Sequence, residues 1–378
     1  MTPSAEVRIA GLGARLFGSL PPEGRRNLPS LPFVGPMTFE RGASIGMRTR
    51  LARLAAILSC ALPAALTPAA GQLARGTSDT AFVLERAGVV PENLVYDPVG
   101  RRFIGGDLEA DGLVEIARDG SIRPFARAAG IAGRVLGLKI DASRGTLWGV
   151  AFERLDPAPG HSGGAAPARS LIFALALPDG RLVRRVASPS DGRSHLFNDR
   201  VVGRDGSVYF TDSEAGAVWA LEPKRDSLRL LHQAPPERFA YPNGIAFLPK
   251  ERGLLVAHWQ GLVSIGLPSG PVTPVRAASD TVVGRVDGLY PACGGFVGIQ
   301  NMTNPSRVIA FDVRGTAVGT VRELERGRPD FRGPTTGGLV GDTLFYVANA
   351  QIGPFDPRRE GGSLAPVLVL KLPLGCDG

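Results

Sequence analysis

Four residues with side-chain oxygen atoms stand at equivalent positions of similar segments along the sequence. They are the acids Glu92 and Asp287 and the amides Asn198 and Asn243, each at the start of an apolar run. Any one of them alone is explained by a turn or strand-capping role, which Asn and Asp favour. Four in register are different, because converging carboxylates and amides are costly to bury unless a cation or a hydrogen-bond network compensates them. Oxygen donors without Cys or His suit a hard cation, Ca²⁺ first, with Mg²⁺, Mn²⁺ or Zn²⁺ as alternatives.

The segments that carry these residues form a repeat. Its first half is a short apolar run, a turn with Gly or Asp-Gly and a second run, and the copies begin at Glu92, Leu136, Asn198, Asn243, Asp287 and Thr336. Each copy continues into a further pair of alternating apolar runs, so each offers four strands. Successive copies begin between 44 residues (Glu92 to Leu136) and 62 residues (Leu136 to Asn198) apart. Four-stranded units at about this period are typical of a β-propeller.

The sequence therefore predicts an all-β fold, a six-bladed β-propeller with four-stranded blades, over residues 79 to 374. The sixth copy is one strand short, and its third strand is the run from Val367 to Leu374. We expect the run from Asp79 to Ala87, which precedes the first copy, to complete the last blade and close the ring. Innermost strands converge on the central channel of a propeller, so the six starting residues should meet at one mouth. A β-sandwich is the structural alternative, but it leaves the six similar units unexplained.

The N-terminal region differs from the rest in charge and hydropathy. Residues 1 to 75 contain nine Arg and three Glu, which gives 9 − 3 = +6 of the formal net charge of +8. The sequence predicts a signal peptide over residues 47 to 70. Its three parts are the arginines 48, 50 and 53, an apolar run that ends at Leu66, and small residues after that run. Residues 1 to 46 are expected to be a poorly structured leader or an over-called start. We expect a periplasmic or secreted protein without stable membrane insertion after signal cleavage.

Charge and cysteine content narrow the function classes further. Outside the N-terminal region the charge is nearly balanced and no basic patch with interleaved aromatic residues occurs, so nucleic-acid binding is not expected. A lipoprotein signal that ends at Cys60 is an alternative to a secretory signal peptide that extends to residue 70. If Cys60 leaves with the signal, Cys293 and Cys376 remain in a compartment that permits disulfides, and both a bridge and two separate thiols fit the sequence. We expect a monomer whose partner is a small-molecule substrate.

The blade-start motifs resemble those of a known family. The stretches PENLVYDP from Pro91, FNDRVVGRDGSVYFTD from Phe197, YPNGIAF from Tyr241 and VDGLY from Val286 are similar to motifs of the gluconolactonase/regucalcin (senescence marker protein) family. The resemblance spans about residues 79 to 374. It implies a six-bladed propeller that holds a divalent cation in its channel and hydrolyses sugar lactones.

By this resemblance the metal ligands are Glu92, Asn243 and Asp287. Asn198 corresponds to a residue near the substrate or a metal-bound water, and we count it among the candidate ligands. The chain departs from the family pattern at Asn93 and the leucine after it, where Gly or Ser followed by Pro is usual. It departs again at Leu136, where a polar substrate contact would be expected.

The predicted chemistry is metal-dependent hydrolysis of a lactone or a related ester. The cation polarises the carbonyl group and lowers the pKa of a bound water, and Asp287 or Asp199 accepts a proton. The candidates for substrate binding are Asn198, Arg134, Lys139, His195, Thr336 and Asn301.

Two alternatives stay open at this point. One is a non-catalytic propeller that binds a small ligand or a protein, since a fold does not fix an activity. The other is a metal-free enzyme similar to strictosidine synthase, which shares the propeller fold.

Overall fold

The structure is a computed structural model that describes residues 78–84, 91–106, 112–126, 131, 133–155, 167–351 and 365–376. The predicted signal peptide and the leader before it lie outside these residues. In the described part of the chain, no helix has the length and hydropathy that a membrane span requires.

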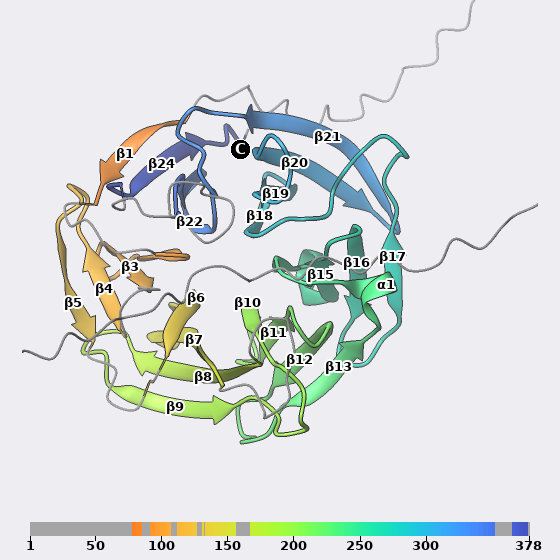
Figure 1. Ribbon diagram of the computed structural model, residues 1–378, viewed down its shortest axis with the longest axis horizontal. Coiled ribbons are helices and arrows are strands. Elements are labelled where there is room, and N and C mark those ends of the chain that lie inside the picture. Colours follow the sequence, from red (N-terminus) through yellow and green to blue (C-terminus); the bar gives the residue numbers. More distant parts are fainter. Residues whose placement is uncertain are drawn as a thin grey trace, which may run out of the picture. The chain divides into compact units, whose positions relative to one another are not determined.

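The described residues form six antiparallel four-stranded sheets arranged in a ring, which confirms the predicted six-bladed β-propeller (Figure 1). Blades 1 and 2 consist of β2 (Leu94–Asp97), β3 (Arg102–Gly106), β4 (Leu113–Ile116), β5 (Ile122–Ala126), β6 (Arg134–Asp141), β7 (Thr146–Arg154), β8 (Ala168–Ala176) and β9 (Leu182–Ala187). Blades 3 and 4 consist of β10 (Phe197–Val202), β11 (Val208–Asp212), β12 (Ala217–Leu221), β13 (Arg229–Gln233), β14 (Ile245–Phe247), β15 (Gly253–Ala257), β16 (Leu262–Gly266) and β17 (Val272–Val275). Blades 5 and 6 consist of β18 (Leu289–Ala292), β19 (Gly295–Gln300), β20 (Arg307–Arg314), β21 (Ala317–Arg326), β22 (Gly337–Val340), β23 (Thr343–Val347), β24 (Leu368–Pro373) and β1 (Asp79–Val83). A short helix α1 (Pro236–Phe239) and a 3-10 turn (Pro249–Glu251) are the helical elements of the described residues.

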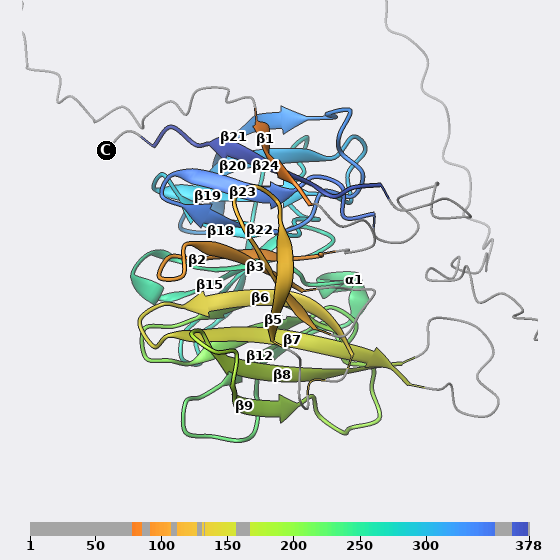
Figure 2. The same ribbon diagram turned by 90° about the vertical axis from the view of Figure 1, so that its left-hand side faces the viewer.

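The ring closes between the two ends of the described chain, as the sequence predicts. Strand β1 pairs antiparallel with β24 and becomes the outer strand of blade 6, with Asp79 opposite Lys371 (Figure 2). A disulfide joins Cys293, in the turn between β18 and β19, to Cys376 after β24. Blades 5 and 6 are therefore linked covalently as well as by packing.

The hydrophobic core is divided among the interfaces between neighbouring blades. Between blades 1 and 2, for example, Val95 and Ile104 pack in one buried cluster with Leu147 and Phe173. Each of the other interfaces between adjacent blades has a corresponding cluster among the described residues. Both faces of the inner strands are therefore buried, and β11, β12 and β15 are buried along their whole length.

The predicted glycine turns set where each inner strand ends. In blade 3 the turn between β10 and β11 places Gly206 at φ 88°, a left-handed conformation that Gly adopts readily. Its amide donates a hydrogen bond to the Gly203 carbonyl at 2.8 Å, and Asp205 Oδ1 accepts one from the Ser207 amide at 2.9 Å. The turn holds β10 as the innermost strand, with Asn198 near its start.

Candidate functional site

Oxygen-bearing side chains predicted from the sequence lie together where the inner strands begin. Asn243 Nδ2 donates a hydrogen bond to Asp287 Oδ1 at 2.7 Å, and Asn301 Nδ2 donates one to Asp287 Oδ2 at 2.5 Å. Glu92 is close enough to Asp287 for their charges to interact. Glu92, Asn243 and Asp287 are all buried. The segments before β2, β14 and β18 and the residue after β19 thus bring two acids, Glu92 and Asp287, and two amides, Asn243 and Asn301, into one cluster, which we call the mouth cluster.

Asn198 and Thr336 border this cluster through hydrogen bonds of their own. Asn198 Nδ2 donates to Ser213 Oγ at 3.1 Å, and Ser213 Oγ donates to the Pro242 carbonyl at 2.8 Å. Thr336 Oγ1 donates to the backbone carbonyl of Glu92 at 3.0 Å. These bonds connect blades 3 and 4, and blades 6 and 1, where their inner strands begin.

The two carboxyl groups of the mouth cluster are held in an environment that disfavours their charge. Burial raises the pKa of Glu92 well above its usual value, and the nearby Asp287 carboxylate raises it further. Burial raises the pKa of Asp287 to about 7, although the hydrogen bond from Asn243 works in the opposite direction. Two buried carboxylates that repel each other are stabilised when a cation neutralises them.

The mouth cluster fits a hard divalent cation. Asn243 Oδ1 is buried and has no hydrogen-bond partner among the described residues. In the described residues, no group of three or more His, Cys, Asp or Glu side chains could hold a metal ion. A cation here therefore needs carboxamide oxygens from Asn243 and Asn198 beside the two acids, a donor set that suits Ca²⁺.

Asp199 and Lys139 lie further along the inner strands than the mouth cluster. Both line a cavity of about 190 Å³ with Tyr290 and residues of β22. The Asp199 carboxylate accepts hydrogen bonds from the Arg200 amide at 2.8 Å and the Ile245 amide at 3.1 Å. Burial raises the pKa of Asp199 and lowers the pKa of Lys139. Asp199, a predicted proton acceptor, and Lys139, a predicted substrate contact, therefore lie together inside the channel.

Arg200 is a buried cation that we did not single out in the sequence. Its side chain is 1% exposed, and its Nε and Nη1 atoms have no hydrogen-bond partner among the described residues. The guanidinium lies against Gly137, where an added Cβ would stand 1.3 Å from Nη2. It interacts electrostatically with Asp199 and Glu92, and burial lowers its pKa to about 10. Gly137 in blade 2 is thus the small residue that gives this arginine room in the channel.

The remaining predicted substrate-binding residues lie apart from the mouth cluster. Arg134 begins β6 and is exposed. His195 is buried at 1% exposure, with Nδ1 at 2.5 Å from Asp212 Oδ2 and Nε2 at 3.0 Å from Asp191 Oδ1. Burial works to lower the pKa of His195, but the hydrogen bonds with Asp212 and Asp191 raise it above the ordinary value. Both ring nitrogens are therefore engaged by carboxylates of blade 3 and of the loop before it.

Tyr241 is a residue at this site that the sequence did not suggest to us. It lines a small hollow with Asn243, Asp287 and Asn301, and it also lines a cavity of about 660 Å³ between blades 3 and 4. Its backbone has φ 50°, the left-handed region that is uncommon for residues other than glycine. Its position two residues before Asn243, within the quoted YPNGIAF motif, was the available signal.

In fold, the chain is a six-bladed β-propeller like gluconolactonase and regucalcin. Among solved structures, it is similar to regucalcin from Agrobacterium tumefaciens, a calcium-binding protein, with 15% identity, a TM-score of 0.54 and coverage of 78% of this chain and 94% of that one. It is also similar to a gluconolactonase from Xanthomonas campestris, with 18% identity, a TM-score of 0.53 and coverage of 79% and 90%.

Proteins with other activities share the same architecture. The aldose sugar dehydrogenase of Streptomyces coelicolor, solved in its PQQ-bound form, matches at 15% identity and a TM-score of 0.52, over 79% of this chain and 98% of that one. No protein-family model matches the sequence, and no curated protein matches it. At these identities the likeness establishes the fold, and the activity has to be argued from the site.

Proposed function

We propose that this protein is a cation-dependent hydrolase of a lactone or a related ester, with the mouth cluster as its metal site. The observation that supports this most is the Asn243 carboxamide. Its nitrogen is bonded to Asp287 while its buried oxygen has no partner among the described residues. An unpaired acceptor beside two mutually repelling carboxylates is an arrangement that a divalent cation would complete.

The residues of the chain divide the work as follows. Glu92, Asn243, Asp287 and Asn198 would hold the cation, with Ca²⁺ favoured and Zn²⁺, Mg²⁺ or Mn²⁺ as alternatives. When bound, such a cation polarises an ester carbonyl and acidifies water. Asn301 fixes one oxygen of Asp287 and Asn198 is fixed by Ser213, so both side chains are oriented before a ligand arrives.

Hydrolysis adds water to the carbonyl carbon, breaks the ring or ester C–O bond and releases a proton. A carboxyl group with a pKa near the working pH is the most effective acceptor for that proton. The Asp287 carboxyl group is one candidate acceptor, although a cation bound to it would lower its pKa below the value of about 7 that burial gives it. Asp199, whose pKa burial also raises, is the second acceptor, deeper in the channel.

We further propose that the protein works outside the cytoplasm as a monomer with a small-molecule substrate. The disulfide between Cys293 and Cys376 supports this location, because such bonds persist in oxidising compartments. The predicted signal peptide supports it independently.

The test is turnover by the chelated protein across lactones and aryl esters, with each of the four cations added back. We expect one cation to restore hydrolysis in the wild type, no turnover in Asp287→Ala, and wild-type turnover in Asp342→Ala, which alters an exposed aspartate. Cation binding without turnover of any compound would favour the binding propeller. Turnover that chelation leaves unchanged would favour the metal-free enzyme.

A further inference from the structure

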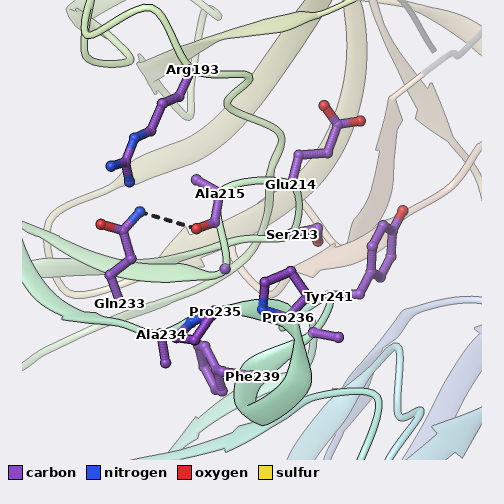
Figure 3. Close-up of a pocket in the computed structure, with 12 residues that line it drawn as sticks. Arg193, Ser213, Glu214, Ala215, Gln233, Ala234, Pro235, Pro236, Phe239 and Tyr241 are labelled. Carbon is purple, nitrogen blue, oxygen red and sulfur yellow. Dashed lines mark hydrogen bonds between the residues drawn. The ribbon is translucent and has the colours of Figure 1, made fainter. Parts of the chain in front are cut away.

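The cavity between blades 3 and 4 has an apolar floor. It measures about 660 Å³, within the range of roughly 300 to 1,000 Å³ that small-molecule sites occupy. Figure 3 shows Pro235, Pro236 and Phe239, from α1 and the residue before it, on one side, and Arg193 and Glu214 on the other. Pro235 and Pro236 are exposed and offer a ligand carbon surface without side-chain hydrogen bonds, whereas Phe239 is 1% exposed and packs in the core between blades 3 and 4.

Polar side chains at this cavity are already engaged by the protein. Glu214 Oε1 lies 2.6 Å from Arg154 Nη1, and Glu214 Oε2 accepts a hydrogen bond from the Ser194 hydroxyl. Gln233 Nε2 donates to the Ala215 carbonyl at 3.1 Å, a bond drawn in Figure 3. A polyhydroxylated ligand would have to compete for these groups, whereas an apolar ligand leaves them in place.

The cavity borders the mouth cluster through two residues. Ser213 lines the cavity and accepts the hydrogen bond from Asn198. Tyr241 lines the cavity and also the hollow that contains Asn243 and Asp287. A molecule seated against Tyr241 in the cavity therefore lies beside the mouth cluster.

Tyr241 is suited to donate a hydrogen bond at this junction. Its side chain lines both the cavity and the hollow that contains Asn243 and Asp287, and its phenol hydroxyl can donate a hydrogen bond to a ligand there. Its left-handed backbone is the kind of local strain that is found at functional sites.

We propose that this cavity binds the alkyl or aryl substituent of the substrate, and that Tyr241 donates a hydrogen bond to its ester or lactone group. The substrate class is then a lactone or ester with a bulky apolar substituent, in contrast to a bare sugar lactone. The assignment of the reacting group rests on the proposed hydrolase function. The apolar specificity of the cavity rests on its residues alone.

The test separates binding from turnover by using lactams, which keep the ring carbonyl and resist hydrolysis. Calorimetry with the full chain and its cation would measure the Kd of γ-lactams that carry alkyl groups of two, four, six and eight carbons. Each buried methylene should tighten binding about fourfold until the cavity is filled. A Kd independent of chain length in the wild type would overturn the proposal.

Matched variants locate the effect. Ala240→Trp and, as a milder filling, Ala234→Leu place bulk in the cavity and should abolish the dependence on chain length. Ala278→Trp, at an exposed alanine outside the cavity, should leave it unchanged. Tyr241→Phe should keep the dependence on length and weaken every lactam about two- to tenfold, the effect of one hydrogen bond. Retained length dependence in both filling variants would overturn the assignment of the cavity.

The same experiment distinguishes failure of this inference from failure of the proposed function. Length-dependent lactam binding without hydrolysis of the matching lactones would support the cavity and contradict the hydrolase. Hydrolysis of lactones at a rate independent of the substituent would support the hydrolase and contradict the cavity.

Discussion

Two buried aspartates, Asp212 in blade 3 and Asp287 at the channel mouth, have opposite surroundings. Asp212 Oδ1 accepts hydrogen bonds from the amides of Leu196 at 3.0 Å and Ala215 at 3.2 Å. Its Oδ2 lies 2.5 Å from His195 Nδ1 and accepts a bond from Trp219 Nε1 at 3.2 Å. Asp287 accepts bonds from two amide side chains and faces a second carboxylate, so its pKa rises to about 7.

The difference separates a structural carboxylate from one that we propose binds a cation. A buried charge that is surrounded by donors and a cationic partner strengthens the fold locally, because its lone pairs are all used. A buried pair of carboxylates with an unpaired amide oxygen beside it is costly until something binds there. The first arrangement ties β10 and β11 to the loop before them, and the second is the arrangement at the channel mouth that we propose a cation completes.

The largest effect should come from removing the structural carboxylate. Asp212→Ala leaves His195, Trp219 and two backbone amides without their acceptor, and should lower the free energy of unfolding by about 3–5 kcal/mol. Asp191 is the second partner of His195, and its side chain is 41% exposed. Asp191→Ala should therefore lower the free energy of unfolding by less than about 1 kcal/mol. Urea denaturation measures the free energy of unfolding of both variants. Equal losses in the two would contradict the structural role that we assign to Asp212.

A second substitution should have the opposite sign. Glu92→Gln removes one of the two repelling charges of the mouth cluster and should raise the unfolding free energy of the chelated protein by about 1–2 kcal/mol at pH 8. The control is Glu115→Gln, which removes the charge that pairs with Arg102 and Arg123 and should destabilise the protein. If Glu92→Gln destabilises the metal-free protein, repulsion between the Glu92 and Asp287 carboxylates does not destabilise the wild type.

The pH dependence of stability should reflect His195. Because its folded pKa is raised, the stabilisation by the charged imidazole is complete below the unfolded value of about 6.5 and is lost as pH rises through the folded pKa. The difference in unfolding free energy between the wild type and His195→Gln should therefore shrink by up to about 1.4 kcal/mol per pH unit in that window. Measuring both proteins from pH 5 to 9 cancels the titration of the mouth cluster. A constant difference across that range would show that His195 has the same pKa in the folded and the unfolded protein, which would contradict the raised pKa.

The smallest effect is expected at the inner end of the channel. Lys139 interacts with Asp199 and lies away from the mouth cluster, so Lys139→Met should change the affinity for the cation by less than about threefold. Asn243→Leu, which removes the unpaired oxygen, should weaken it about tenfold or more. Comparable losses in the two variants would place the cation deeper in the channel than we propose.

The fold was predictable because its signals are local and repeated. Six copies of strand, turn and strand gave the blades, and the missing strand of the last copy required a partner such as the run from Asp79. The register of Glu92, Asn243 and Asp287 was readable for the same reason, since each begins an equivalent inner strand. The bridge between Cys293 and Cys376 was not decided, because a distance across 83 residues of sequence cannot be read from composition.

The partners of individual side chains could not be predicted, because they come from distant segments. His195 precedes Asn198 by three residues, yet its ring faces Asp212 and Asp191. Asp199 follows Asn198 directly, yet it lines the inner cavity with Lys139, since neighbouring residues of a strand point to opposite sides. Arg200 fits in the channel only because Gly137 of another blade leaves room, a complementarity that no single motif contains.

The most direct test of the mouth cluster as a cation site is calorimetric titration of the chelated full chain with Ca²⁺, beside Glu92→Gln and Asp342→Ala. We predict one saturable site in the wild type and in Asp342→Ala, and at least about tenfold weaker binding in Glu92→Gln. If Ca²⁺ fails to bind, Mg²⁺, Mn²⁺ and Zn²⁺ follow in the same format. No binding of any of the four cations, or equal binding by Glu92→Gln, would contradict a metal site at the channel mouth.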